Sequence, residues 1–247
     1  MTTSPRLAAA LSDGDAVEPR DAGSVLVVQG REPWRVLMMR RPREADFAAG
    51  VYVFPGGSVH AEDAHLPDPV RGAALRELFE EVCILLARAA SPARRFARDA
   101  DAERVREALG RGLGFWSALA ACDLEPAFDR LVFCTRWITP ERVRRRFDTR
   151  FYLARLPGRQ TIQPQPSEVV DWRWVTPEEA VSSAEVELIH ATRRILELVG
   201  AEGDASRLVA RLRRRAETPP VTPRIVDVAD GHVQVVDDAI TLFPSRR

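Results

Sequence analysis

Apolar and β-branched residues gather in short runs along the chain, and these runs predict a sheet. Residues 24–29 and 35–40 read SVLVVQ and RVLMMR, and the turn-prone residues 30–33 between them predict a strand pair. A third run, residues 52–54, ends at the Pro-Gly-Gly of residues 55–57, because proline removes a donor and glycine permits unusual backbone angles. Further strands are expected at residues 131–138, 150–156 and 169–175.

A repeat of three and four residues marks the best-defined helix, which is predicted over residues 71–89. Its apolar stripe consists of Leu75, Leu78, Phe79, Val82, Leu85, Leu86 and Ala89. Cys83 lies within this range and is expected to continue the helix. Residues 91–129 are rich in Ala, Arg and Glu and predict a helical insertion, and two more helices are expected at residues 186–199 and 206–215.

Two stretches with the same Thr-Pro-Glu sequence, residues 139–141 and 176–178, each predict the start of a helix. Threonine suits the cap, and proline suits the first helical position. Near the C-terminus, two short apolar runs around Ile225 and Val233 follow three prolines and predict a hairpin.

These elements predict a protein of the α/β (α+β) class. One sizeable domain is expected at residues 22–200, with the helical insertion at 91–129 inside it. Residues 1–21 predict a flexible N-terminal tail that has neither the signature of a signal peptide nor that of a membrane anchor. Residues 201–247 are expected to add a C-terminal helix and hairpin extension.

Composition excludes several classes of protein. With 45% hydrophobic and 29% charged residues, the chain falls in the globular range rather than the disordered one. Its 36 basic residues balance 36 acidic ones, so no overall field favours nucleic acid or an anionic membrane. Three cysteines without C-x-x-C spacing argue against a disulfide framework and a cysteine-rich zinc site, and they predict a reducing cytoplasm.

Three glutamates cluster on the predicted helix opposite its apolar stripe, namely Glu77, Glu80 and Glu81. At about 100° per residue they are neighbours, and like charges at such spacings destabilise a helix by roughly 0.2–0.5 kcal/mol per pair. A cation is therefore expected among them, either Arg76 at the edge of the cluster or bound Mg²⁺ or Mn²⁺, which hard carboxylate oxygens suit. Taken alone, the pattern is more typical of a solvated helix face.

The residues upstream of the helix extend this pattern. The box of the Nudix hydrolases reads G-x5-E-x7-R-E-U-x-E-E-x-G-U, where U is a bulky aliphatic residue. The residues that match it are Gly57, Arg76, Glu77, Leu78, Glu80, Glu81 and Ile84. The chain thus resembles the Nudix hydrolases. The resemblance implies the Nudix fold, in which a mixed β-sheet lies between α-helices, and it implies attack of water on phosphorus. The metal site that the resemblance implies consists of Gly57, Glu77, Glu80 and Glu81.

Three positions depart from the box. Asp63 stands where the box has Glu, twelve residues rather than seven separate it from Arg76, and Cys83 replaces the usual glycine. The extra residues predict a loop before the helix.

Three further stretches, residues 51–63, 137–154 and 168–180, resemble the acyl-coenzyme A diphosphatases of peroxisomes and their bacterial relatives. This branch implies coenzyme A or acyl-coenzyme A as the substrate, and ADP-ribose, NADH or another nucleoside diphosphate derivative is the alternative within the enzyme class. A catalytically silent Nudix-fold ligand sensor is the alternative of another class, and the retained glutamates speak against it. Residues 245–247 are not the peroxisomal Ser-Lys-Leu signal, so the cytoplasm is expected.

Catalytic roles are expected of Arg76, Glu80 and Glu81. Relatives take the general base either from the box or from a late loop, so Glu81 is the first candidate and Glu168, just before a strand, is the second.

Four residues are expected to contact the substrate: His60, Asp63, Arg146 and Arg150. The planar fork of arginine suits phosphate, although each of these side chains has a structural alternative. The expected partner is a small nucleotide-like diphosphate rather than nucleic acid or membrane, and a homodimer stays open.

Overall fold

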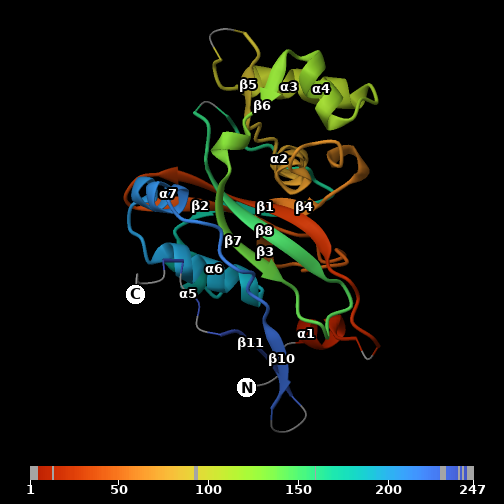
Figure 1. Ribbon diagram of the computed structural model, residues 1–247, viewed down its shortest axis with the longest axis vertical. Helices are drawn as coiled ribbons and strands as arrows, with labels where there is room; N and C mark the ends of the chain where they lie inside the picture. The colour runs from red at the N-terminus through yellow and green to blue at the C-terminus, as the bar shows by residue number, and fades with distance from the viewer. Residues whose placement is uncertain are drawn as a thin grey trace.

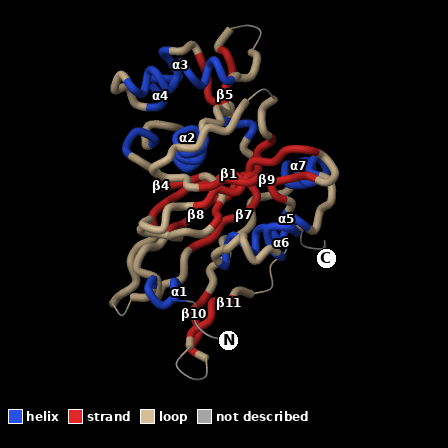
Figure 2. The backbone as a smooth tube through the Cα atoms, turned by 180° about the vertical axis from the view of Figure 1, so that it is seen from behind, coloured by secondary structure: helices blue, strands red, loops and turns tan. Residues whose placement is uncertain are grey.

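A seven-stranded mixed sheet forms the middle layer of the computed structural model (Figure 1). The structure describes residues 5–12, 14–91, 94–158, 160–228, 232–238, 240, 242 and 243. Helix α2 (Pro69–Val82) covers one face of the sheet, whereas α5 (Pro177–Ser182) and α6 (His190–Gly200) cover the other, as the view from behind also shows (Figure 2). The predicted arrangement of a mixed sheet between helices is confirmed.

The strands of this sheet are β1 (Arg20–Gly30), β2 (Trp34–Arg40), β3 (Tyr52–Val53), β4 (Gly56–Ser58), β7 (Val132–Ile138), β8 (Phe147–Arg155) and β9 (Asp171–Val175). They run in the order β3-β2-β1-β8-β7, with β4 added to β1 and β9 added to β2. β1 and β8 are parallel, and the other pairs are antiparallel. The predicted strand pair is β1–β2, and β8 begins at Phe147 rather than at residue 150.

Both faces of β1 are buried, which explains its nearly continuous apolar run. Val25 and Val27 pack with Leu78 of α2 in one core. Leu26 and Val28 point to the opposite core, beneath α6. The alternation of side chains along the strand thus divides one apolar run between two cores.

Helix α2 begins at a capped position and packs closely on β1. The Asp68 carboxylate accepts a hydrogen bond from the Arg71 amide at 3.1 Å, and Pro69 occupies the first turn. A Cβ atom at Gly23 of β1 would lie 2.3 Å from the carbonyl oxygen of Val70, so glycine permits this approach of helix to strand.

The prediction that the helix continues through Cys83 is wrong. Helix α2 ends at Val82, and Cys83 adopts the left-handed conformation with φ 61°. The box has glycine at this position, and glycine adopts the left-handed conformation without steric cost. Cys83 adopts the same backbone conformation, although cysteine does not favour it. Residues 83–86 form neither helix nor strand, and Ala87–Ala89 form a short strand. A brief apolar run does not distinguish helix from strand.

The segment after α2 forms a helical unit with its own core. It contains β5 (Ala87–Ala89), α3 (Asp99–Gly110), α4 (Phe115–Ala121), β6 (Leu124–Pro126) and a 3-10 turn (Phe128–Arg130). Its buried side chains pack against Phe79 and Cys83 on the outer side of α2. The predicted helical character is confirmed, and the antiparallel β5–β6 pair at the base of the unit was not predicted.

The two Thr-Pro-Glu stretches have different outcomes. The Thr176 hydroxyl accepts a hydrogen bond from the Glu179 amide and caps α5, as predicted. The helix start predicted at residues 139–141 is wrong, because the Thr139 hydroxyl accepts instead from the Phe147 amide and closes the connection between β7 and β8. A threonine that could cap a helix can therefore accept a hydrogen bond from a neighbouring strand instead.

Beyond α6, the chain adds α7 (Ala205–Arg213) and the hairpin β10 (Arg224–Asp227) and β11 (Val233–Val236). Leu208 and Leu212 of α7 belong to the core beneath α6, and the Trp34 indole donates to the Glu202 carbonyl at 2.9 Å. Within the residues predicted as an N-terminal tail, the structure places α1 (Pro5–Ala10) and the start of β1. No helix in the described part of the chain is long and apolar enough to cross a membrane.

Candidate active site

The Gly56-Gly57 strand lies directly against the carboxylates of α2. β4 pairs with β1, and the Gly56 amide donates to Oε2 of Glu81 at 2.8 Å. A Cβ atom at residue 57 would lie 2.5 Å from the carboxyl carbon of Glu77, so only glycine permits this contact. The structure thus brings together Gly57, Glu77 and Glu81, as the sequence predicted.

Arg76 is fully buried and clamps three carboxylates. Nη1 donates to Glu77 at 2.8 Å and to Glu80 at 2.7 Å, and Nη2 donates to Asp63 and to the Ser58 carbonyl, both at 3.0 Å. Burial disfavours the guanidinium cation, but the hydrogen bond to Asp63 and the charges of the glutamates outweigh it, so the pKa of Arg76 is raised above its usual value. Arg76 therefore fixes the geometry of this cluster.

The structure corrects the role expected of Asp63. Its side chain is fully buried, and its oxygens accept hydrogen bonds from Arg76, from the Trp116 indole at 3.1 Å and from the His60 amide at 2.9 Å. A carboxylate so enclosed contacts no substrate. Asp63 is instead the buried anchor of the Arg76 guanidinium.

The helical insertion contributes directly to this anchor, which the sequence did not predict. Trp116 is in α4, and the neighbouring Phe115 amide donates to Glu62 at 2.9 Å. Glu62 in turn lies 4.0 Å from Arg76. The contacts join segments more than fifty residues apart, and no local sequence signal reveals them.

Glu81 is buried with little compensation. Its exposed fraction is 1%, and Arg41 at 3.7 Å is the cation nearest to its carboxylate among the described ion pairs. Burial, followed by the charge of Glu77, raises the pKa of Glu81 well above its ordinary value, while the Gly56 amide and Arg41 oppose the shift. Arg41 was missed from the sequence, although its position two residues after Met39 places it on the α2 side of β2.

Burial also raises the pKa of Glu77 and the pKa of Glu80, despite the opposing hydrogen bonds from Arg76. The charge of the exposed His60 lowers the pKa of Glu77, so His60 lies within electrostatic range of the cluster. A deprotonated cluster therefore needs more positive charge than Arg76 supplies.

Glu168 is exposed, and its negative charge raises the pKa values of Glu77 and Glu81. Its loop is tied to the end of α2, where the Gln165 amide donates to the Glu81 carbonyl at 2.9 Å. The Gln160 side chain fastens the start of this loop through hydrogen bonds to Leu85 at 2.7 and 2.9 Å. The second candidate base thus lies near the first.

The donor set of the cluster fits a hard divalent cation. Two guanidinium groups, those of Arg41 and Arg76, face a larger number of carboxylates, which are those of Glu62, Asp63, Glu77, Glu80, Glu81 and Glu168. Among the described residues, no three such groups are already arranged around one common metal position. In this arrangement Arg76 holds Glu77 and Glu80 by hydrogen bonds.

The structure does not bring Arg146 and Arg150 to the carboxylates. Arg146 donates to the carbonyls of Thr139 and Val17 at 3.0 and 2.8 Å. Its guanidinium thus binds the backbone of the β7–β8 connection and of the segment before β1. Burial raises the pKa of Tyr152, and the positive charge of the nearby Arg150 opposes this shift in part. In the described part of the chain, no hydrogen bond or ion pair joins either arginine to the cluster.

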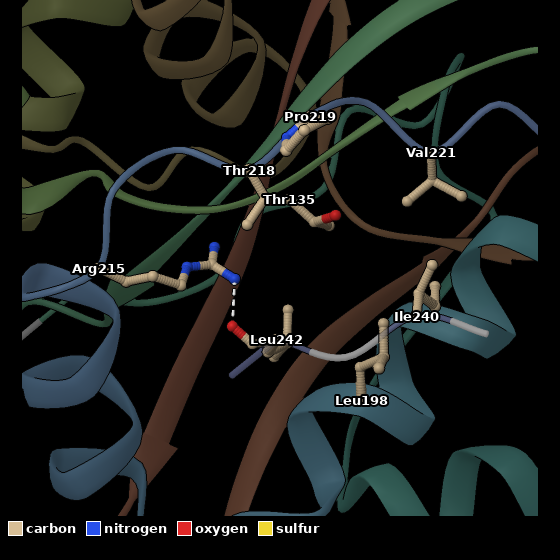
Figure 3. Close-up of a pocket in the computed structure, with 8 residues that line it drawn as sticks. All are labelled: Thr135, Leu198, Arg215, Thr218, Pro219, Val221, Ile240 and Leu242. Atoms are coloured by element: carbon tan, nitrogen blue, oxygen red, sulfur yellow. Dashed lines mark hydrogen bonds between the residues drawn. The ribbon is translucent and has the colours of Figure 1, made fainter. Parts of the chain in front are cut away.

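A small hollow near the C-terminal segment is a separate feature. It measures about 80 Å³ and is lined by Arg215, Thr135 and several apolar side chains, and Arg215 donates to the Leu242 carbonyl (Figure 3). Its lining contains no carboxylate, and it is too small for a nucleotide. The candidate site is therefore the cluster on α2.

Comparison with known families gives a match over more than half of the chain. Residues 64–197 match the family model described as the NUDT19 Nudix domain. The match includes α2 with all its glutamates, the insertion and most of α6.

Individual relatives agree with this result. The chain is 32% identical over 165 residues to the curated Caenorhabditis elegans protein "Putative nudix hydrolase 7", covering 67% of this chain and 54% of that protein. The chain thus spans about half the length of this relative. The crystal structure of a NUDIX hydrolase from Alicyclobacillus acidocaldarius superposes with a TM-score of 0.66 at 23% identity, covering 78% of this chain and 96% of that one, which supports the fold.

Proposed function

Because this chain belongs to the Nudix hydrolase superfamily, we propose that it uses Mg²⁺ or Mn²⁺ to hydrolyse the diphosphate of coenzyme A or acyl-coenzyme A. The products are a phosphopantetheine part and a 3′,5′-phosphoadenosine part. The observation that carries the proposal is the buried Glu81, whose carboxylate faces Glu77 and Glu168 with Arg41 as its nearest cation.

Glu77 and Glu81 are the residues that would hold the ion, with Glu80 beside them, since their oxygens border Gly56 and Gly57. When bound, the ion polarises phosphoryl oxygens and makes a bound water more acidic. Arg76 orients Glu77 and Glu80 and thereby acts as a positioning residue.

Two carboxylates are candidates to accept the proton of the attacking water. Oε1 of Glu81 is the oxygen that the Gly56 amide leaves free, and its burial favours proton uptake. Glu168 is the alternative, since it is exposed at the end of a loop close to the cluster. Arg41 is suited to bind a phosphate oxygen of the substrate, because its guanidinium borders Glu81.

The coenzyme A class rests on the resemblance of residues 51–63, 137–154 and 168–180 to the acyl-coenzyme A diphosphatases. Three free, buried cysteines support placement in a reducing compartment such as the cytoplasm.

The test is a screen of purified protein against coenzyme A, dodecanoyl-coenzyme A, ADP-ribose, NADH and nucleoside triphosphates, with Mg²⁺ and with Mn²⁺. We expect the highest kcat/KM for coenzyme A or its thioester. A kcat/KM ten times higher for ADP-ribose or a nucleoside triphosphate would contradict the coenzyme A proposal and assign the protein to that other substrate class. Binding without turnover of any compound would favour a ligand sensor.

A further inference from the structure

A large cavity lies on the face of the sheet opposite α2. It measures about 1040 Å³, which is slightly larger than the range of about 300–1000 Å³ that is typical of small-molecule sites. Its walls come from α1, the loop of residues 45–51, the β7–β8 connection, the start of α6 and the β10–β11 hairpin. Figure 1 shows α1 and the β10–β11 hairpin at the end of the molecule away from the insertion.

The cavity is lined mainly by apolar and aromatic side chains, including Phe47, Val51, Phe147, Phe151, Leu188 and Ile189. Phe47 and Phe147 pack edge to face, with ring centroids 5.0 Å apart. Such a surface favours a ligand that itself lacks hydrogen-bonding groups.

Several polar side chains of the lining already have partners. Arg145 pairs with Asp46 at 2.9 Å, and His190 contacts Asp237 at 2.7 Å. Arg193 donates to a backbone carbonyl at 2.8 Å. A polar ligand such as a nucleobase would have to compete for these groups, whereas an aliphatic chain would leave them as they are.

One arginine connects this cavity to the carboxylate cluster. Nε of Arg41 donates to the carbonyl of Phe47 at 3.1 Å, and Nη1 lies 3.7 Å from Glu81. Phe47 lines the cavity. A ligand whose phosphates bind at Arg41 and Glu81 would therefore lie next to the loop of residues 45–51, which forms one wall of the cavity.

We propose that this cavity receives the acyl chain of an acyl-coenzyme A whose diphosphate lies at Glu81 and Arg41. The inference rests on the proposed function, since it assigns the thioester arm of that substrate to a particular surface. Its consequence is chain-length dependence, because each methylene taken into an apolar site improves affinity by up to about fourfold.

The experiment plugs the cavity from two different walls. Ala49→Trp acts from the loop and Ala191→Trp from α6, and both alanines line the cavity. Ala121→Trp is the matched control, because Ala121 is exposed at the end of α4 in the insertion. Either plug that folds suffices, as judged by its unfolding transition.

Binding is measured by calorimetry in chelator with dodecanoyl-pantetheine, which has an acyl chain and no diphosphate. We expect binding by the wild type and by Ala121→Trp, and at least tenfold weaker binding by the plugged variants. In hydrolysis assays, kcat/KM should rise with acyl length in the wild type and lose this rise in the plugged variants, while unacylated coenzyme A changes less than threefold.

Two results would overturn the assignment. The first is equal binding of dodecanoyl-pantetheine by plugged and wild-type protein, or none by either, even if coenzyme A is hydrolysed normally. The second is a selective effect of the plugs on 3′,5′-ADP binding or on a dimer, which would give the cavity to the nucleotide or to a second copy of the chain. Conversely, acyl binding that the plugs abolish supports the cavity even if no diphosphate is hydrolysed, so the two proposals fail separately.

Discussion

The two ends of the carboxylate cluster differ in how their charge is compensated. At one end, the buried guanidinium of Arg76 donates to Asp63, Glu77 and Glu80 at 2.7 to 3.0 Å. At the other end, Glu81 has one backbone amide and an arginine 3.7 Å away. The carboxylates at the first end have their compensating cation within the chain. The carboxylate at the second end has little compensation, and this is the end at which we propose that the ion binds.

The largest effect is expected where the compensation is complete. Replacing Arg76 by Met leaves the buried carboxylates of Asp63 and Glu77 and the exposed carboxylate of Glu80 without their cation. This loss should lower the free energy of unfolding by about 3–5 kcal/mol. Urea unfolding measures this. The control is Arg142→Met, whose pair with Asp227 is exposed and should contribute less than about 1 kcal/mol. If the two variants lost similar amounts of unfolding free energy, the buried hydrogen bonds of Arg76 would contribute no more to stability than an exposed ion pair.

At the other end, the expected effect is on catalysis rather than folding. Glu81→Gln should lower kcat by at least about two orders of magnitude and leave the protein folded, because it removes a metal and proton-accepting oxygen and keeps the acceptor for Gly56. We predict a similar loss of kcat for Glu80→Gln, with a larger loss of stability because Glu80 pairs with Arg76. Near-normal kcat in both variants would contradict the assignment of Glu80 and Glu81 to the active site.

The same comparison predicts a pH dependence of the metal-free protein. The pKa of Glu81 is raised in the folded state, so between its unfolded and folded pKa values the native protein binds more protons. Unfolding free energy should therefore fall as pH rises above the ordinary glutamate range, and this fall should be smaller in Glu81→Gln. Urea titrations in chelator between pH 4 and pH 8 measure the difference, and parallel curves would contradict the raised pKa.

The smallest effect is expected at the edge of the clamp. Trp116→Phe removes one hydrogen bond to Asp63 and keeps most of the ring packing, so a loss of about 1–2 kcal/mol is expected. Since Asp63 then holds Arg76 less firmly, kcat should fall more than KM changes. Trp172→Phe, at a half-exposed site of β9, is the control and should change neither quantity. A loss of stability without any change in kcat would make Trp116 merely structural.

Features set by local spacing were predictable from the sequence. The helical repeat placed Glu77, Glu80 and Glu81 together, because these residues share the regular period of one helix. The position of Gly57 near them and the mixed sheet between helices were implied by the resemblance to the Nudix hydrolases.

Features that depend on tertiary contacts were not predictable. Trp116 and Asp63 are 53 residues apart, and only the folded insertion brings the indole to the carboxylate. Arg41 is one of many arginines, and its role depends on where β2 ends beside α2. Cys83 was misread because its backbone keeps the shape of the glycine that it replaces.

The most direct test of the account is the response of thermal stability to metal. Melting temperatures of the wild type, Glu81→Gln and the control Glu125→Gln, an exposed residue of the insertion, are compared in chelator and in millimolar Mg²⁺ or Mn²⁺. A ligand that binds only the folded state stabilises by about 2.7 kcal/mol at a hundredfold excess over Kd. We predict a clear rise for the wild type and Glu125→Gln, and little or none for Glu81→Gln. An equal rise in all three proteins would show that the carboxylates of α2 do not hold the ion.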